Sequence, residues 1–382
     1  MNSPAVNSPA VNSPAANPLT ERFDGAAEVL DEIAARNPDT RDYLSETRRI
    51  VGTYHPRRLH LIVAGIIDET ATTKTFQLKG VDREELPPFM AGQYVNVFLD
   101  GTSRPFAISS SPTGLHHYDL TVRRVPGGRI SNMLIDTVSV GEILTTTGPM
   151  GTFFHNPLFH GSDVVFLAGG SGVAPAMSMI REIADRGLDR RFRLLYGSRE
   201  ADDIIFHAEL DQLAGAHPNI HVHHVIGDLL TADTITELVG DLDGRMVYVC
   251  GPQVFYPFAL EQLTALGQPR RRIRFEANGA PADPTAEPDW PTGVDAEGEV
   301  TITIGGSSFR TPRNRPLLDA LEDNGIRPEV ACRSGECSLC RVRVCEGRVY
   351  TAPQAKLRMS DTRSGYTHSC VAYPISDVEL EF

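Results

Sequence analysis

The sequence lacks any long apolar run, and this absence limits where the chain can reside. No stretch approaches the roughly 20 consecutive apolar residues that a membrane-spanning helix requires, so we expect no integral membrane segment. The opening residues, MNSPAVNSPAVNSPAANP, have neither the basic start nor the apolar core of a secretory signal. A cytoplasmic location is therefore the default expectation.

A basic excess is lacking as well. The formal net charge is −13, whereas a nucleic-acid-binding protein needs a basic patch that displaces counterions. We therefore expect no nucleic-acid partner. The hydrophobic content of 41% and the charged content of 22% are ordinary for a soluble globular protein, and 382 residues suffice for two to four domains.

Cysteines are few and unevenly spread. Three of the six lie within residues 332–340, and Cys345 follows closely. Evenly spread cysteines in a short secreted chain would indicate disulfides, but a tight cluster in a long chain indicates a metal site.

The N-terminal part of the chain differs in composition from the rest. Residues 1–17 repeat Asn-Ser-Pro-Ala, with a proline at every fifth position, which prevents a helix and offers no apolar core. We predict a disordered tail there. Residues 18–56 are predicted to form a helical extension, whose role the sequence does not identify.

The remainder predicts a multidomain protein. Residues 57–156 contain short strands punctuated by Gly and Pro, which favours an antiparallel sandwich or barrel. In residues 157–277 strands alternate with helices, which indicates an α/β domain with a parallel sheet. Residues 278–298 have the Pro-rich and acidic composition of a linker, and residues 299–382 form a last small module.

The sequence CRSGECSLC carries the strongest functional signal. Its cysteines have the spacing C-x4-C-x2-C of plant-type [2Fe–2S] proteins, and a further cysteine lies near the chain end. Four thiolates must converge on two irons, and the small residues of the loop allow it to wrap the cluster. The cysteines concerned are Cys332, Cys337, Cys340 and Cys370.

A zinc site is the alternative for these cysteines. Zinc ribbons and fingers usually use C-x2-C pairs, and a four-residue gap in a run of three cysteines is unusual for them. We therefore favour the [2Fe–2S] cluster. Cys345 lies in the predicted strand VRVCEGRV, where we expect a small buried residue without a metal role.

The last module, from VTITIGG to THSCVAYP, resembles a plant-type ferredoxin domain, an α+β fold of the β-grasp kind. The resemblance implies that Cys332, Cys337, Cys340 and Cys370 are the cluster ligands. The module has 11 acidic and 11 basic residues, so we expect its partner to recognise shape more than long-range charge.

A Gly-rich turn, LAGGSGVAPAMSMI, joins a predicted strand to a predicted helix. Gly169, Gly170 and Gly172 would let the backbone approach a pyrophosphate, and the helix N-terminus favours negative charge. Such a turn alone is weak evidence, because many strand–helix junctions contain glycine for packing. Two later segments, YGSREADDIIFHAEL and the turn Cys-Gly-Pro, strengthen the interpretation.

Together these segments resemble the nicotinamide domain of the ferredoxin–NADP reductase superfamily. The resemblance implies that the Gly-rich turn, including Pro175, holds the pyrophosphate, and that Cys250, Gly251 and Pro252 lie near the nicotinamide ring. Cys250 could otherwise be a buried core thiol. Ser198 and Arg199 occupy the place where the superfamily often binds a 2′-phosphate. The acidic residues that follow, Glu200, Asp202 and Asp203, would repel a phosphate and favour NADH over NADPH.

The same superfamily binds its flavin on an antiparallel barrel with the pattern R-x-Y-S. The corresponding residues here are Arg104, Phe106, Ala107, Ile108 and Ser109. The resemblance implies that the Arg104 guanidinium binds phosphate and that Phe106 stacks on the ring. Ala107 replaces a Ser near flavin N5, a loss for which Ser109 could compensate.

A second flavin-phosphate motif is implied after strand YDLTVRRV. It comprises Gly127, Gly128, Arg129, Ile130 and Ser131. Ser131 could equally be the N-cap of a helix. The sequence GPMGTF at 148–153 favours FAD over FMN, and Glu276 is implied to approach the flavin as a catalytic group beside Cys250.

The domain order resembles the single-chain reductases of bacterial oxygenases. It implies electron flow from NAD(P)H through flavin and cluster to an oxygenase, hydroxylase or desaturase. Two alternatives are a redox or nucleotide sensor that acts through a partner, and an electron-input subunit of another flavin dehydrogenase. For His221, His223 and His224, on one predicted strand, we expect surface or core roles more than metal binding.

Overall fold

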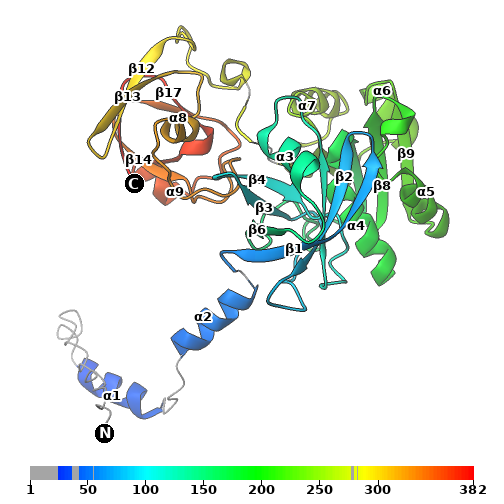
Figure 1. Cartoon of the computed structure of the whole chain (residues 1–382), viewed down its shortest axis with the longest axis horizontal. Coiled ribbons are helices and arrows are strands. Elements are labelled where there is room, and N and C mark those ends of the chain that lie inside the picture. The colour runs from blue at the N-terminus through cyan, green and yellow to red at the C-terminus, as the bar shows by residue number, and fades with distance from the viewer. Residues whose placement is uncertain (1–24, 37–42, 55, 277–278, 282) are drawn as a thin grey trace. The chain divides into compact units, whose positions relative to one another are not determined.

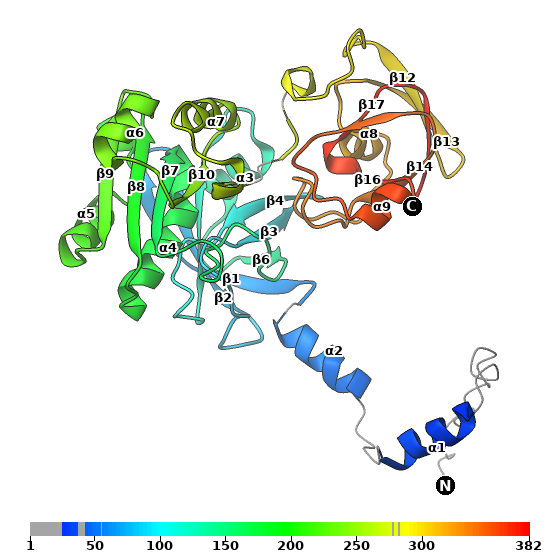
Figure 2. The same cartoon turned by 180° about the vertical axis from the view of Figure 1, so that it is seen from behind.

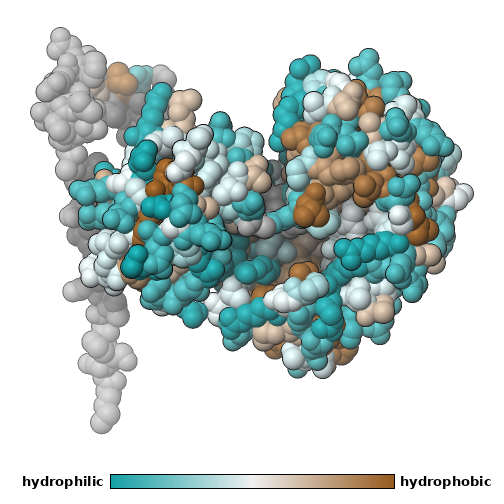
Figure 3. All heavy atoms as spheres, turned by 90° about the horizontal axis from the view of Figure 1, so that it is seen from above, coloured by the Kyte–Doolittle hydropathy of each residue, from teal (hydrophilic) through white to brown (hydrophobic). Residues whose placement is uncertain are grey.

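The computed structural model describes residues 25–36, 43–54, 56–276, 279–281 and 283–382 (Figure 1). It divides into two compact units, residues 1–51 and 52–382. The predicted helical extension contains α1 (Ala26–Arg36) and α2 (Tyr43–Tyr54), while the predicted disordered tail lies outside the described residues. No helix in the described part of the chain is long and apolar enough to cross a membrane. Hydrophilic side chains cover much of the face drawn in Figure 3, with apolar ones scattered between them.

Six antiparallel strands form the first domain and confirm the predicted barrel. Their order is β4-β3-β6-β1-β2-β5, and a bridge between Ile108 and Leu120 joins the two edges of the sheet. Alternate apolar residues such as Leu61, Val63 and Leu120 fill the interior, where each contributes about 1.5–3 kcal/mol by leaving water. The elements are β1 (Leu59–Thr70), β2 (Thr73–Gly80), β3 (Tyr94–Leu99), β4 (Thr102–Ala107), β5 (Tyr118–Arg123), α3 (Arg129–Thr137) and β6 (Ile143–Thr146).

The second domain is the predicted parallel sheet, with the strand order β11-β10-β7-β8-β9. Figure 2 shows β10, β7, β8 and β9 in this order. The central strand β7 is apolar on both faces, because Val164 and Phe166 belong to one core and Val165 and Leu167 to the other. Its strands are β7 (Asp163–Gly169), β8 (Arg191–Ser198), β9 (Ile220–Ile226), β10 (Met246–Cys250) and β11 (Ile273–Phe275). Its helices are α4 (Val173–Arg186), α5 (His207–Ala216), α6 (Ala232–Val239) and α7 (Phe255–Ala265), with the 3-10 turns η2 (Gly170–Gly172), η3 (Ala201–Asp203) and η4 (Arg270–Arg272).

The C-terminal module is a mixed sheet covered by a helix, as the α+β prediction requires. The sheet order is β13-β12-β18-β14-β16, and β15 pairs with β17. Leu317 and Leu321 of the helix enter the core of the sheet. The elements are β12 (Glu299–Ile304), β13 (Ser307–Pro312), α8 (Leu317–Asp323), β14 (Arg341–Glu346), β15 (Val349–Thr351), α9 (Met359–Arg363), β16 (Tyr366–His368), η6 (Ser369–Val371), β17 (Ala372–Pro374) and β18 (Val378–Glu381).

Two details of this module differ from simple expectation. Cys345 is exposed, so its predicted burial is wrong: it shares the outward face of β14 with Arg341 and Arg343. Trp290, in the segment with linker composition, packs on the module, because its ring lies 5.1 Å from the Tyr350 ring and 6.3 Å from the Tyr373 ring, centroid to centroid. The segment includes the turn η5 (Pro284–Ala286).

Candidate functional site

The four cysteines of the ferredoxin-like pattern converge at one place. Cys332, Cys340 and Cys370 are buried and Cys337 is half-buried. The Cys332 sulfur interacts with the thiols of Cys337 and Cys370, and Cys340 in turn interacts with Cys370. These thiol hydrogen bonds, that from Cys337 first, hold the pKa of Cys332 well below its usual range. The arrangement gathers four potential thiolate ligands in a site shielded from water.

Backbone groups of the loop also point at sulfur. The N–H groups of Ser334, Glu336 and Cys337 each donate to Cys332 Sγ at 3.4 Å. Gly335 has φ +82°, and a Cβ there would come within 2.8 Å of Val371 Cγ2, so the loop needs glycine at this position. A buried nest of four thiols with N–H donors fits a [2Fe–2S] cluster, whose sulfurs accept such bonds.

The cysteine loop lies directly on the barrel. Ser103, the residue before Arg104 of the flavin pattern, donates through Oγ to the carbonyl oxygen of Ala331 at 3.4 Å. The Tyr94 hydroxyl donates to Glu336 Oε2 at 3.5 Å, and the Thr152 hydroxyl donates to Glu336 Oε1 at 3.3 Å. Tyr94 pairs with Ala107 across β3 and β4. The loop that gathers the cysteines and the strand that carries the flavin pattern are therefore neighbours.

Strand β4 presents the flavin pattern with its key side chains accessible. Arg104 is exposed, and Phe106 and Ala107 are half-buried, so all three could contact a bound flavin. Ile108 lies in the barrel core. Ser109 is fully buried, and its hydroxyl lies 3.2 Å from the Asp119 carbonyl oxygen and 2.9 Å from Thr121 Oγ1. The Ser109 hydroxyl is thus bonded within the barrel wall, and its compensation for Ala107 stays a prediction.

The second flavin motif leads into α3. The helix begins at Arg129 with Gly128 as its N-cap, so Ser131 lies in the first turn and the alternative of an N-cap role for it is wrong. No side chain caps this end. Gly127 has φ +71°, and a Cβ there would have nothing described within 4 Å. An uncapped helix N-terminus beside an open glycine fits phosphate oxygens, and Ile130 anchors the turn in the core.

The structure brings the two glycine motifs of the parallel-sheet domain together. Because β7 and β10 are neighbours, the Gly-rich turn after β7 meets the Cys-Gly-Pro turn after β10. A Cβ on Gly172 would lie 2.2 Å from the Cys250 carbonyl oxygen, and one on Gly169 would lie 3.2 Å from Pro252. Gly170 has φ +53°, and Gly251 lies beside Gly169. Pro175 occupies the buried first turn of α4. These turns form one glycine-lined edge of the sheet.

A thiol and a carboxyl meet at the same edge. Cys250, the last residue of β10, donates through Sγ to Glu276 Oε2 at 2.7 Å. Burial raises the pKa of Glu276 to about 7, although the hydrogen bond from Cys250 opposes the shift. Burial and the nearby carboxylate also raise the pKa of the Cys250 thiol. The pair therefore holds a proton that can titrate near neutral pH.

The end of β8 shows how the acidic run is arranged. Ser198 is buried at the end of the strand and Arg199 is exposed. Asp203 forms an ion pair with Arg123 of the barrel, and Thr72 Oγ1 donates to Asp203 Oδ1 at 3.3 Å. Asp203 is therefore neutralised, whereas Glu200 and Asp202 are exposed.

Sequence reasoning missed the residues that join the domains. Glu336 lies inside the cysteine loop and forms an ion pair with Lys356. Its charge, between the cysteines of the pattern, was a signal in the sequence that could have identified it. Tyr94 and Arg123 carry no sequence signal, because their partners are more than 75 residues away in the chain.

Three family models match the chain in the predicted order. An oxidoreductase FAD-binding domain matches residues 61–155, an oxidoreductase NAD-binding domain matches residues 166–261, and a 2Fe-2S iron-sulfur cluster binding domain matches residues 301–374.

Curated relatives match along most of their length. The ferredoxin reductase component of 3-ketosteroid-9-alpha-monooxygenase from Mycolicibacterium smegmatis is 30% identical, covering 85% of this chain and 97% of that protein. The glycine betaine monooxygenase reductase subunit of Chromohalobacter salexigens is 31% identical, covering 83% and 93%. Among solved structures, phthalate dioxygenase reductase matches with a TM-score of 0.62 and 26% identity, covering 85% of this chain and 98% of that one.

Proposed function

Since the chain belongs to the ferredoxin–NADP reductase superfamily, as a single-chain oxygenase-type reductase with FAD, NAD and [2Fe–2S] domains, we propose that it reduces a partner oxygenase, hydroxylase or desaturase with electrons from a nicotinamide nucleotide. FAD, when bound, accepts a hydride as two electrons and releases these singly to the cluster. The observation that carries the proposal is the contact of the cysteine loop with the barrel beside the flavin pattern.

Each group has residues suited to it. Cys332, Cys337, Cys340 and Cys370 would ligate the cluster, whose potential in plant-type proteins is about −400 mV. On the barrel, Arg104 and the N-terminus of α3 would hold the FAD phosphates, while Phe106 would cover the ring. These residues would bind and orient the flavin.

The glycine edge of the parallel sheet would bind the nicotinamide nucleotide. The turn of Gly169, Gly170 and Gly172 accommodates the pyrophosphate, and the N-terminus of α4 favours its charge. Cys250 and Glu276 would lie at the nicotinamide end, where the carboxylate favours the positive charge that the ring gains on losing a hydride. The Glu276 carboxylate would thus act on the ring by its charge, and the pair would hold a proton between Cys250 Sγ and Glu276 Oε2.

NADH is the proposed donor in preference to NADPH. Glu200 and Asp202 are exposed where a 2′-phosphate would lie, beside Ser198 and Arg199. Asp203 does not add to the repulsion of this phosphate, because its charge is neutralised by Arg123. Two uncompensated carboxylates still oppose a phosphate dianion.

We also propose a cytoplasmic location. The cysteines are all unpaired in the described residues, which favours a reducing compartment and hence the cytoplasm. The partner would be a protein that docks on the C-terminal module, since the relatives are named as reductase components or subunits of monooxygenases and the cysteine cluster lies in that module. The proposed domain limits are 57–156 for the barrel and 157–277 for the nucleotide domain.

Anaerobic stopped flow tests the proposal. NADH should bleach the flavin first and the cluster second, and the reduced protein should show a rhombic electron paramagnetic resonance signal. Cytochrome c should be reduced with an ordinary enzymatic turnover of about 1–1000 per second. Turnover far below this range would contradict the reductase assignment and would favour a sensor.

A further inference from the structure

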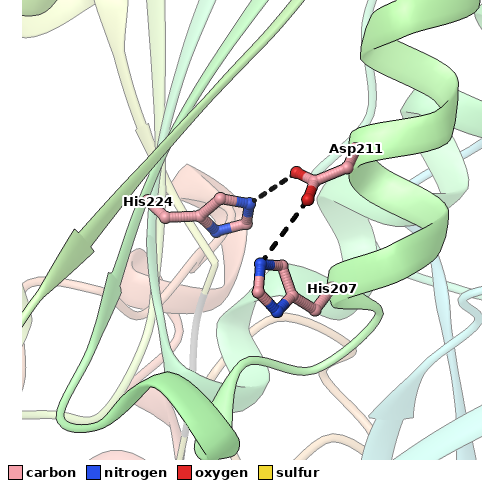
Figure 4. A group of neighbouring side chains, drawn as sticks. All are labelled: His207, Asp211 and His224. Atoms are coloured by element: carbon pink, nitrogen blue, oxygen red, sulfur yellow. Dashed lines mark hydrogen bonds and ion pairs between the residues drawn. The ribbon is translucent and has the colours of Figure 1, made fainter.

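A cluster of two histidines and one aspartate lies apart from the redox site (Figure 4). His207 and Asp211 come from the first turns of α5, and His224 comes from β9. His207 Nε2 lies 3.5 Å from Asp211 Oδ2, and His224 Nε2 lies 3.1 Å from Asp211 Oδ1. One potential ligand atom from each residue lies within 4.8 Å of the others.

The scaffold fixes these side chains from two sides. His207 and Asp211 are four residues apart, a spacing that places them on the same face of a helix. The start of this helix is anchored, since the Ile205 N–H donates to the Tyr196 hydroxyl at 3.2 Å and Phe206, at φ +59°, turns the chain into α5. The ring of His224 extends from a strand bonded on one side to β8 and is only 16% exposed.

The spacing of the three groups is close to metal stereochemistry. Ligand atoms about 2.0–2.2 Å from a tetrahedral Zn²⁺ stand roughly 3.3–3.5 Å apart. The two imidazole nitrogens lie 3.5 Å and 3.1 Å from the Oδ2 and Oδ1 atoms of Asp211, respectively, and one ligand atom from each residue lies within 4.8 Å of the others, so rotation of the side chains suffices to bring all three atoms onto one ion. The two imidazole rings lie 4.8 Å apart between centroids and meet edge to face.

We propose that His207, Asp211 and His224 bind a divalent transition-metal ion of the zinc class, with water completing the coordination. His207 and Asp211 are 48% and 59% exposed, so an ion can enter from solvent. The bound ion ties the first turns of α5 to β9, the edge strand of the parallel sheet. It belongs to neither the cysteine cluster nor the flavin site, and it stabilises the domain by binding the folded state alone.

Zinc binding by the holoprotein tests the proposal. The background variant is Cys345→Ser, because Cys345 is an exposed thiol that could bind zinc by itself. After washing with a chelator, the protein with its flavin and cluster is titrated with Zn²⁺ by calorimetry, and bound zinc is counted after gel filtration. The cluster absorbance is followed throughout, so that any loss of iron is detected.

Asp211→Asn and His224→Gln remove one ligand each while keeping side-chain size, and His221→Gln is the matched control. His221 is exposed on the same strand but outside the cluster. We expect one equivalent of Zn²⁺ in the background variant and in the control, with a rise in melting temperature. Each ligand variant should bind at least about tenfold more weakly, since loss of even an outer-shell partner costs 10–100-fold.

Two results would overturn the metal assignment. The first is no saturable zinc binding in the background variant, which would leave the cluster a set of ordinary hydrogen bonds. The second is zinc binding of equal affinity in the Asp211 and His224 variants. Flavin content and NADH oxidation should be unchanged in all variants, which shows that each one is folded.

Discussion

Glu276→Gln is the substitution that most sharply probes the chemistry at the glycine edge. The Glu276 carboxyl accepts a hydrogen bond from the Cys250 thiol at 2.7 Å, and burial raises the pKa of Glu276 from 4.5 to about 7. Gln keeps the shape and an acceptor oxygen but removes the charge. If the carboxylate favours hydride loss from the nucleotide, its ionisation should control the rate of flavin reduction near neutral pH.

The expected magnitude follows from the charge of Glu276. Its raised pKa sets the pH at which this charge appears, whereas Coulomb's law sets the size of the effect: a carboxylate about 5 Å from a unit positive charge contributes about 3 kcal/mol at an effective dielectric constant of about 20. A nicotinamide ring carries only part of its positive charge in the transition state, so we take roughly half of this value as the electrostatic gain. This is about tenfold in rate.

The assay is the rate of flavin reduction by NADH, measured by anaerobic stopped flow between pH 5.5 and 8.5. The wild-type rate should rise about tenfold through pH 7, and the Glu276→Gln rate should stay near the acidic wild-type limit. Glu261→Gln, which alters an exposed carboxylate of α7, is the control and should keep the wild-type profile. Parallel profiles for wild type and Glu276→Gln would refute the reasoning.

The same carboxyl makes a stability prediction of defined sign. Because its folded pKa is raised, the folded state holds a proton that the unfolded state releases between pH 4.5 and about 7. Wild-type stability relative to Glu276→Gln is therefore greatest below pH 4.5 and is lost as pH rises through 7, by up to about 3 kcal/mol. Thermal unfolding of the holoprotein at pH 5 and pH 8 measures this difference, and an equal difference at both pH values would contradict it.

Three further predictions concern the other sites. Cys370→Ser should lose the rhombic signal and cytochrome c reduction but keep NADH-dependent ferricyanide reduction, whereas Cys345→Ser should keep all three; iron content and electron paramagnetic resonance decide this. Gly172→Ala should destabilise the nucleotide domain by about 1–3 kcal/mol, because the added Cβ would lie 2.2 Å from the Cys250 carbonyl oxygen. The control Gly114→Ala, whose Cβ would have nothing within 4 Å, should leave stability unchanged, and thermal unfolding compares the two variants. Ala107→Ser should speed flavin reduction several-fold by adding a donor worth about 1 kcal/mol near the ring, since the buried Ser109 hydroxyl is already bonded to Asp119 and Thr121. An unchanged stopped-flow rate would oppose this and would indicate that Ser109 or a backbone N–H already serves the ring.

Local spacing explains which parts of the site were predictable. Cys332, Cys337 and Cys340 lie within nine residues, so one loop conformation brings them together and their spacing is visible in the sequence. The glycine turns are equally local. Their mutual contact is not, because it depends on β7 and β10 being neighbours in the sheet, a fact of topology that the order of the strands along the chain does not determine.

The burial of Cys345 was predicted from its residue type, although the alternation of the strand indicates exposure. Cysteine is usually buried, and this tendency suggested an interior position. Strand alternation gives the opposite answer, because Arg341, Arg343 and Cys345 share one face of β14 and both arginines require solvent. The period of two was the better guide here, and Val342 on the other face is fully buried, as that period requires.

The contact between the cysteine loop and the barrel explains why Glu336 lies among the cysteines. A carboxylate there accepts from Tyr94 and Thr152 of the barrel and pairs with Lys356 of its own module. A single charged side chain thus satisfies donors from both domains at once, and the ion pair with Lys356 limits the cost of partly burying it. Since the strand partner of Tyr94 is Ala107, this junction fixes the cysteine loop against the strand proposed to bind the flavin. Electron transfer between the two proposed cofactor sites therefore needs no large domain movement in the arrangement seen here.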